Sequence, residues 1–216
     1  MSFITWIGFV IAATLIAISP GSGAILSMSH GLAYGLKKAS ATVLGLQLGL
    51  VLVLVIAGAG VGSLLLASEP AFTVVKVVGA LYLIWLGISQ WRSQAEADGV
   101  PTAAVATAGH AAHPTFGRRV LTGFLTNATN PKGIIFMVAV LPQFIAQDAP
   151  VLPQLAILGA TMVTIDTTVM HGYALLASSM QRWFRDPRAV KAQNRFFGGV
   201  LVVVGALLFF VKPAHA

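Results

Sequence analysis

One carboxylate, Asp166, lies inside a long apolar stretch and is the residue with the clearest capacity for chemistry. It is 13 residues from Pro153 and 16 from Arg182, so a helix rising about 1.5 Å per residue places it near the centre of a membrane-spanning segment. A carboxylate at that depth is energetically costly and by default indicates a functional site. Asp166 could bind a substrate ammonium group, carry a proton, or form a structural ion pair with Lys132, and the sequence leaves these interpretations open.

Two short motifs place a proline inside an apolar segment, Ser19-Pro20-Gly21-Ser22 and Asn130-Pro131-Lys132. Proline kinks or breaks a helix, and a serine or asparagine followed by proline is also the pattern of a helix start. We therefore predict that Ser19 and Asn130 cap two half-helices that begin at Pro20 and Pro131. Unwound backbone is tolerated in lipid only where it lines a cavity or is buried in protein. The alternative is a pair of simple proline kinks without a ligand role.

Lys132 stands at the start of the second predicted half-helix, where free N–H groups already favour an anion. That anion could be a substrate carboxylate or Asp166. Gln47 could bind the substrate, or it could make only an interhelical hydrogen bond. His171 could take part in proton transfer, or it could have only a packing role, since it lies about 140° around the helix from Asp166. The predicted substrate site comprises Ser19, Pro20, Gly21, Ser22, Gln47, Asn127, Asn130, Pro131, Lys132 and Asp166, and the predicted proton-coupling groups are Asp166 and His171.

The composition is that of a membrane protein. Of 216 residues, 57% are hydrophobic and only 9% are charged, whereas about a quarter are charged in a soluble domain. Runs such as 51–56 and 200–206 are apolar on every face, which favours helices over the alternating strands of a membrane barrel. The net charge of +7 comes from residues in short loops, so we do not expect a nucleic-acid partner. The absence of cysteine excludes disulfides and thiolate metal sites.

The apolar segments predict an all-α membrane protein with six transmembrane helices. They are 3–34, 40–66, 71–91, 118–147, 153–180 and 195–212, the first broken at Pro20 and the fourth at Pro131. The third span of each half carries spaced glycines that would allow close helix packing. These are Gly79 and Gly87 in the first half and Gly199 and Gly205 in the second. We therefore predict two inverted three-helix repeats, 1–91 and 118–216, joined by a cytoplasmic linker, 92–117.

Basic residues are distributed unevenly over the loops, which predicts the orientation. Those after the first, third and fifth spans are Lys37, Lys38, Arg92, Arg118, Arg119, Arg182, Arg185, Arg188, Lys191 and Arg195. By the positive-inside rule this side faces the cytoplasm and both termini lie on the periplasmic side. Residues 1–7 lack the positive region of a signal peptide, so we expect the first segment to be a retained span.

Several stretches resemble the RhtB family of the lysine-exporter (LysE) superfamily. They are Ser19-Pro20-Gly21-Ser22-Gly23-Ala24, Gly45-Leu46-Gln47-x-Gly49, residues 79–87, Asn130-Pro131-Lys132 and Leu141-Pro142-Gln143-Phe144. The resemblance covers the whole chain in order, including Asp166 and Gly172-Tyr173-Ala174. Many members of the superfamily have a second proline where Ser22 stands, whereas the homoserine-type branch has a serine. His171 departs from the apolar residue expected at its position.

This resemblance implies a secondary transporter that exports small neutral amino acids across the bacterial inner membrane, driven by the proton gradient. Homoserine, homoserine lactone and threonine are the first substrates that it implies. We expect no enzymatic activity, cofactor or metal, and the expected partners are the substrate, protons and the lipid bilayer, with a homo-oligomer left open.

Two alternatives to an amino-acid exporter also stay open. One is a cation or metal-ion exporter, since Asp166 could serve a metal ion, although one buried carboxylate without cysteine makes a poor metal cage. The other is an intramembrane enzyme or assembly subunit, against which stands the lack of a nucleophile–base pair in the sequence.

Overall fold

The computed structural model describes residues 1–67, 69–92, 114–146, 148–177 and 186–210. Within these ranges every regular element is helical, which confirms the predicted class. The elements are α1 (Phe3–Ile18), α2 (Ser22–Tyr34), α3 (Leu36–Ala67), α4 (Glu69–Arg92), α6 (Phe116–Ala128), α7 (Pro131–Val140), the 3-10 turn η2 (Leu141–Phe144), α8 (Val151–Leu175) and α10 (Pro187–Phe210). Most of the predicted linker, 92–117, and the basic residues Arg182 and Arg185 lie outside the described residues.

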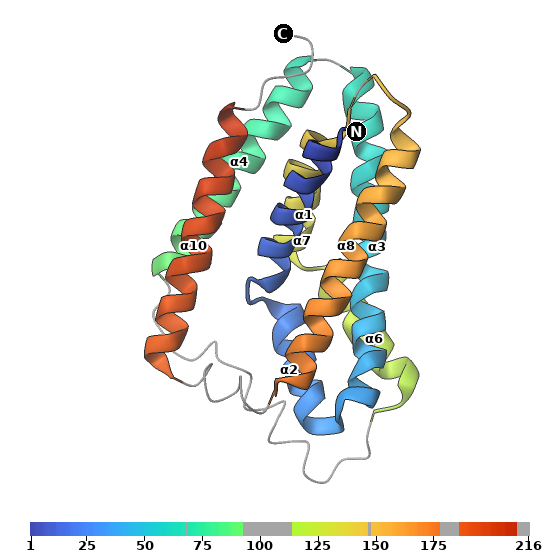
Figure 1. Ribbon diagram of the computed structural model, residues 1–216, viewed down its shortest axis with the longest axis vertical. Coiled ribbons are helices and arrows are strands. Elements are labelled where there is room, and N and C mark those ends of the chain that lie inside the picture. Colours follow the sequence, from blue (N-terminus) through green and yellow to red (C-terminus); the bar gives the residue numbers. More distant parts are fainter. Residues whose placement is uncertain (68, 93–113, 147, 178–185, 211–216) are drawn as a thin grey trace.

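Two pairs of helices are sharply bent at short breaks. α1 and α2 meet at 56°, and α6 meets α7 with its η2 extension at 51°. Both breaks lie near mid-height of the bundle (Figure 1). The predicted breaks near Pro20 and Pro131 are therefore confirmed. Each bent pair passes as one membrane span by length and composition, and Leu36–Gly60 of α3 and Val151–Leu175 of α8 each pass alone.

Several helix ends differ from the predicted spans. α10 begins at Pro187 rather than at 195, and α8 ends at Leu175 rather than at 180. An apolar run marks the part of a helix that lipid would cover, whereas the helix itself can continue through polar residues of good helix propensity. As a result Arg188, Lys191 and Arg195 lie on the first turns of α10 and not in a loop.

Glycines set the closest contact between α3 and α6. A Cβ added to Gly49 would stand 2.6 Å from the carbonyl oxygen of Phe124, and one added to Gly123 would stand 2.9 Å from the backbone nitrogen of Leu46. Real side chains do not approach backbone so closely, so these positions accept only glycine at the observed separation. The contact brings the break between α6 and α7 against the middle of α3.

The pair formed by α4 and α10 is also packed through glycines, as predicted from their spacing. A Cβ on Gly87 would lie 2.5 Å from the carbonyl oxygen of Gly198, and one on Gly205 would lie 2.8 Å from that of Ala80. Figure 1 shows this pair on one side of the molecule, with α1 and α7 in the centre and α3 and α8 on the other side. The N-terminus and the last turn of α10 lie at the same end.

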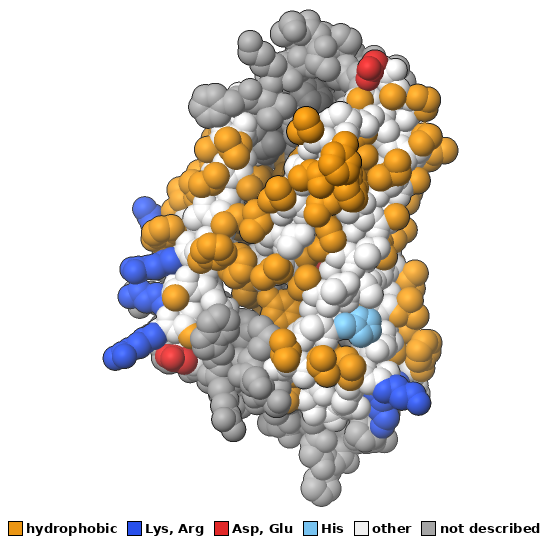
Figure 2. Space-filling view, in the orientation of Figure 1, with side chains coloured by type: hydrophobic (Ala, Val, Ile, Leu, Met, Phe, Trp, Pro, Cys, Tyr) orange, Lys and Arg blue, Asp and Glu red, His pale blue; other side chains and the backbone are white. Residues whose placement is uncertain are grey.

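The largest core lies around the central helices. Phe9 of α1, Met137 of α7, Leu141 of η2 and Leu158 of α8 are completely buried. On the outside, by contrast, large apolar side chains such as Val55 are exposed, and apolar side chains cover the middle of the face in Figure 2. An apolar exterior around a packed interior is the arrangement expected of a chain whose surrounding solvent is lipid.

Candidate functional site

The break between α6 and α7 has the predicted capping geometry. Asn130 is the N-cap of α7, and its side-chain oxygen accepts a hydrogen bond of 3.1 Å from the backbone N–H of Lys132. Pro131 occupies the first turn, where its missing N–H has no intrahelical acceptor to lose. The remaining N–H groups of this turn give the start of α7 a partial positive charge.

The break between α1 and α2 differs from the prediction. Ser19 is not an N-cap: it ends α1, and its N–H donates to the carbonyl of Leu15 at 3.1 Å. α2 begins at Ser22 rather than at Pro20, and its N-cap, Gly21, supplies no side-chain hydrogen bond. The residue before a proline avoids the helical region, and Ser19 is extended, with ψ of 122°, so α1 ends there. Gly21 is extended as well, with φ of −160°, so α2 begins only after it.

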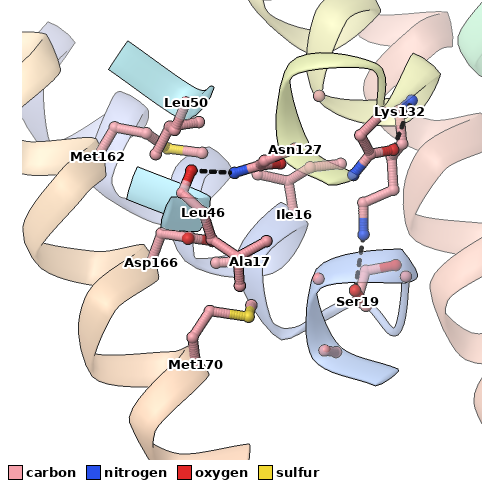
Figure 3. Close-up of a pocket in the computed structure, with 15 residues that line it drawn as sticks. Ile16, Ala17, Ser19, Leu46, Leu50, Asn127, Lys132, Met162, Asp166 and Met170 are labelled. Atoms are coloured by element: carbon pink, nitrogen blue, oxygen red, sulfur yellow. Dashed lines mark hydrogen bonds between the residues drawn. The ribbon is translucent and has the colours of Figure 1, made fainter. Parts of the chain in front are cut away.

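Both breaks open onto one cavity of about 50 Å³, drawn in Figure 3. Six of the predicted site residues line it: Ser19, Gly21, Asn127, Asn130, Lys132 and Asp166. Its apolar wall comes from Ile16, Ala17, Leu46, Leu50, Met162 and Met170, among others. Pro20, Ser22, Gln47, Pro131 and His171 are not among the residues that line it. The prediction that both breaks face a shared cavity is confirmed.

Lys132 crosses from the start of α7 to the end of α1. Its Nζ donates a hydrogen bond of 2.6 Å to the carbonyl oxygen of Ser19, and a Cβ on Gly21 would lie 3.4 Å from the same nitrogen. The unpaired carbonyls at the end of α1 carry partial negative charge. They supply the stabilisation that a cation at the start of α7 requires. The sequence could not predict this contact, because it forms only when α1 and α7 pack together in the folded chain.

A second long-range donor, which the sequence did not predict, holds the same helix end. The Tyr173 hydroxyl of α8 donates to the carbonyl of Ile18 at 2.5 Å. Two consecutive carbonyls at the end of α1 are thus satisfied by side chains from the second half of the chain. The only sequence signal for Tyr173 was its place in the Gly172-Tyr173-Ala174 motif.

Asp166 is held from the opposite side of the cavity. Its side chain is 8% exposed, and its Oδ2 accepts a hydrogen bond of 2.7 Å from Nε2 of Gln47 in α3. Gln47 therefore orients the Asp166 carboxylate from α3, without lining the cavity itself. Within the described part of the chain Asp166 makes no ion pair with Lys132, and each group instead has a neutral partner of its own.

Several polar groups of this region are already paired, whereas two are not. Asn127 donates through Nδ2 to the carbonyl of Leu46 at 2.8 Å, and the Asn130 side chain caps α7. The hydroxyl of Ser19 and the side-chain oxygen of Gln47 are buried and have no hydrogen-bond partner. Buried polar groups without partners are costly, and of these two residues Ser19 lines the cavity whereas Gln47 does not, so the Ser19 hydroxyl is the atom available to a ligand that enters the site.

His171 lies apart from the cavity, between α8 and α3. Its Nδ1 donates to the carbonyl of Thr167 at 2.8 Å, and its Nε2 lies 3.1 Å from the hydroxyl of Ser40. The ring points to a different face of α8 from that of Asp166, as the 140° offset predicted. The structure therefore does not bring the two predicted proton-coupling groups together.

The fold and the cavity define a helical membrane protein with a buried, charged site at two helix breaks. A family model described as LysE type translocator matches residues 14–211, so the chain belongs to this family. It is a transporter and not an enzyme, and the predicted LysE/RhtB membership is confirmed.

Relatives span the whole chain. A homoserine/homoserine lactone efflux protein of Salmonella typhi is 41% identical over 99% of this chain and 100% of its own length. An uncharacterized membrane protein of Vibrio cholerae is 39% identical over 98% of this chain and 100% of its own length. A leucine efflux protein of Klebsiella pneumoniae is 29% identical over 95% of this chain and 94% of its own length. No solved structure matches the chain.

Proposed function

We propose that this chain exports small neutral amino acids across the bacterial inner membrane, with homoserine, homoserine lactone and threonine as its first substrates. The name of the Salmonella typhi relative, 41% identical, supports this substrate class. The observation that carries the proposal is the cavity at the two helix breaks, because it brings Lys132, Asp166 and the start of a half-helix into one small space.

A free amino acid is a zwitterion, so its site needs a positive group and a negative group a few ångströms apart. Lys132 and the N–H groups at the starts of α2 and α7 suit the carboxylate. Asp166 suits the ammonium group, and Gln47 orients its carboxylate from behind. Asn127 and Asn130 complete the polar wall of the cavity, while Pro20, Ser22 and Pro131 shape the helix starts that carry the N–H groups.

Proton coupling follows from the same carboxylate. Asp166 cannot hold an ammonium ion strongly once it has taken up a proton, so binding of the substrate and binding of a proton are alternatives at one group. This competition gives antiport without a second buried acid. His171, linked to Ser40 at 3.1 Å, is the proposed second proton carrier.

We further propose that α1–α2, α3 and α4 form one three-helix repeat and that α6–α7, α8 and α10 form the second, inverted repeat. The units are then 1–91, a cytoplasmic linker 92–117, and 118–216. Corresponding contacts support this division, since α3 packs on α6 and α8 packs on α1. An even number of crossings also agrees with the N-terminus and the end of α10 at one end of the molecule (Figure 1).

Purified protein in liposomes loaded with labelled threonine, homoserine or homoserine lactone would test the function directly. We expect export that is faster when a proton gradient is imposed than when a proton ionophore collapses it. Vesicles without the protein, and vesicles loaded with labelled glutamate, are the controls. Equal efflux in the presence and absence of the protein would reject amino-acid export, and efflux indifferent to the gradient would reject proton antiport alone.

A further inference from the structure

A second, smaller cavity adjoins the polar one. Its volume is about 10 Å³, and apart from Ser19 its lining is entirely apolar. Leu83 of α4, Phe136 of α7 and Leu201 of α10 belong to its wall, and all three are almost completely buried. It therefore lies where the α4–α10 pair meets the central helices.

Ser19 and Ile16 are shared by the two cavities. They consequently form the partition between the charged compartment and the apolar one. The Ser19 carbonyl is bound by Lys132, but its hydroxyl is buried without a partner and its side chain is 4% exposed. Among the polar side chains that line the larger cavity, Asn127 and Asn130 each already make one hydrogen bond, whereas the Ser19 hydroxyl makes none.

We propose that the small apolar cavity is the side-chain compartment of the substrate site and that the Ser19 hydroxyl binds a hydroxyl group on that side chain. The inference rests on the proposed function and narrows its substrate class. With the ammonium and carboxylate groups held at Asp166 and Lys132, the side chain of the amino acid extends past Ser19 towards α4 and α10. A compartment with one hydroxyl at its entrance and little apolar volume behind it suits side chains that combine a hydroxyl with one or two carbons.

The size of the compartment also sets an upper limit on the side chain. A cavity of this volume holds about one water-sized group, so a branched aliphatic side chain must displace the wall. Leu83 and Leu201 belong to packed helices, and protein interiors resist such displacement. The α4–α10 pair is therefore the element that selects for small side chains.

Counterflow in liposomes, measured with threonine, 2-aminobutyrate and leucine, would test the compartment. 2-Aminobutyrate is threonine without the hydroxyl group. For Ser19→Ala we expect the half-saturating concentration of threonine to rise about tenfold, the effect of about 1.4 kcal/mol, with that of 2-aminobutyrate changed less than twofold. For Leu83→Ala we expect the half-saturating concentration of leucine to fall about tenfold, with little change in that of threonine.

Leu158→Ala is the matched control, because Leu158 is equally buried but lies outside both cavities. Val204→Ala removes less of the same wall and serves if Leu83→Ala does not fold. The inference is overturned if Ser19→Ala raises the half-saturating concentrations of threonine and 2-aminobutyrate equally. It is also overturned if Leu83→Ala and Val204→Ala change the half-saturating concentration of leucine no more than Leu158→Ala does. A wild-type protein that exchanges none of these amino acids would overturn the proposed function, and with it the compartment.

Discussion

Lys132 and Asp166 line one cavity, but neither is neutralised by the other. Lys132 donates to the Ser19 carbonyl and Asp166 accepts from Gln47, so both charges are held by neutral groups. Two opposite unit charges attract each other by Coulomb's law, an attraction that a neutral partner does not offer. A zwitterion that offers its carboxylate to Lys132 and its ammonium to Asp166 would therefore displace the present partners.

Asp166→Asn keeps the shape of the side chain and removes its charge. We expect this variant to insert and fold but to lose export driven by a proton gradient, because Asn can neither bind a proton in the required range nor neutralise an ammonium group. Transport assays in liposomes would measure this, with Asp148→Asn as the control at an exposed carboxylate. Survival of counterflow would assign Asp166 to the proton alone, and near-normal driven export would reduce it to a structural residue.

Lys132→Ala should separate substrates by whether they carry a carboxylate. Hydrogen bonds to charged groups contribute about 1.5–3 kcal/mol, so threonine transport should weaken about 10- to 150-fold. Homoserine lactone has no carboxylate and should be affected much less. Half-saturating concentrations for the two substrates provide the measurement, and Lys191→Ala on α10, where the lysine is exposed, is the control. Equal losses for both substrates would mean that Lys132 holds the fold through Ser19.

At the scale of the elements, local chemistry explains what the sequence could predict. Asn130 followed by Pro131 specifies a helix start through contacts within three residues, and the structure has that start. At Ser19-Pro20 the same local pattern allowed either a start or an end. The structure has an end there, and Lys132 and Tyr173 bind its last carbonyls from more than 100 residues away. The shared cavity was predictable from two interrupted apolar segments, but its lining required the packing of α3 and α8.

The contact between α3 and α6 should depend on glycine at particular positions. Gly123→Ala would press a methyl group against the backbone of Thr42 and Leu46, and overpacking of this kind costs about 1–3 kcal/mol. Gly117→Ala on the same helix meets no atom within 4 Å and should stabilise by up to about 1 kcal/mol, the usual gain over glycine in a helix. Thermal unfolding in detergent would compare them. Similar unfolding midpoints for both variants would contradict the close packing of α3 on α6.

As a whole, the molecule consists of a central bundle that holds the cavity and a helix pair beside it. α4 and α10 pack closely on each other through Gly87 and Gly198, and they meet α7 where a Cβ on Gly79 would lie 3.2 Å from Cα of Ala139. The apolar compartment lies along this boundary. A movement of the pair relative to the bundle would therefore change the volume of the compartment.

The charge distribution predicts how this whole assembly sits in the membrane. Basic residues in short loops stay in the cytoplasm during insertion, and they count most within about 15–20 residues of a span. In this chain they gather after the first, third and fifth predicted spans, while the opposite side has Lys212 and Lys76. A reporter enzyme that is active only outside the cytoplasm should therefore work when fused after Ala216 and fail when inserted within 92–117. A second reporter that is active only in the cytoplasm should give the reverse result at both sites, which controls for expression. If the linker fusion were the one active outside the cytoplasm, the predicted orientation would be wrong. If both fusions reported the same side, the chain would not cross the membrane an odd number of times between them.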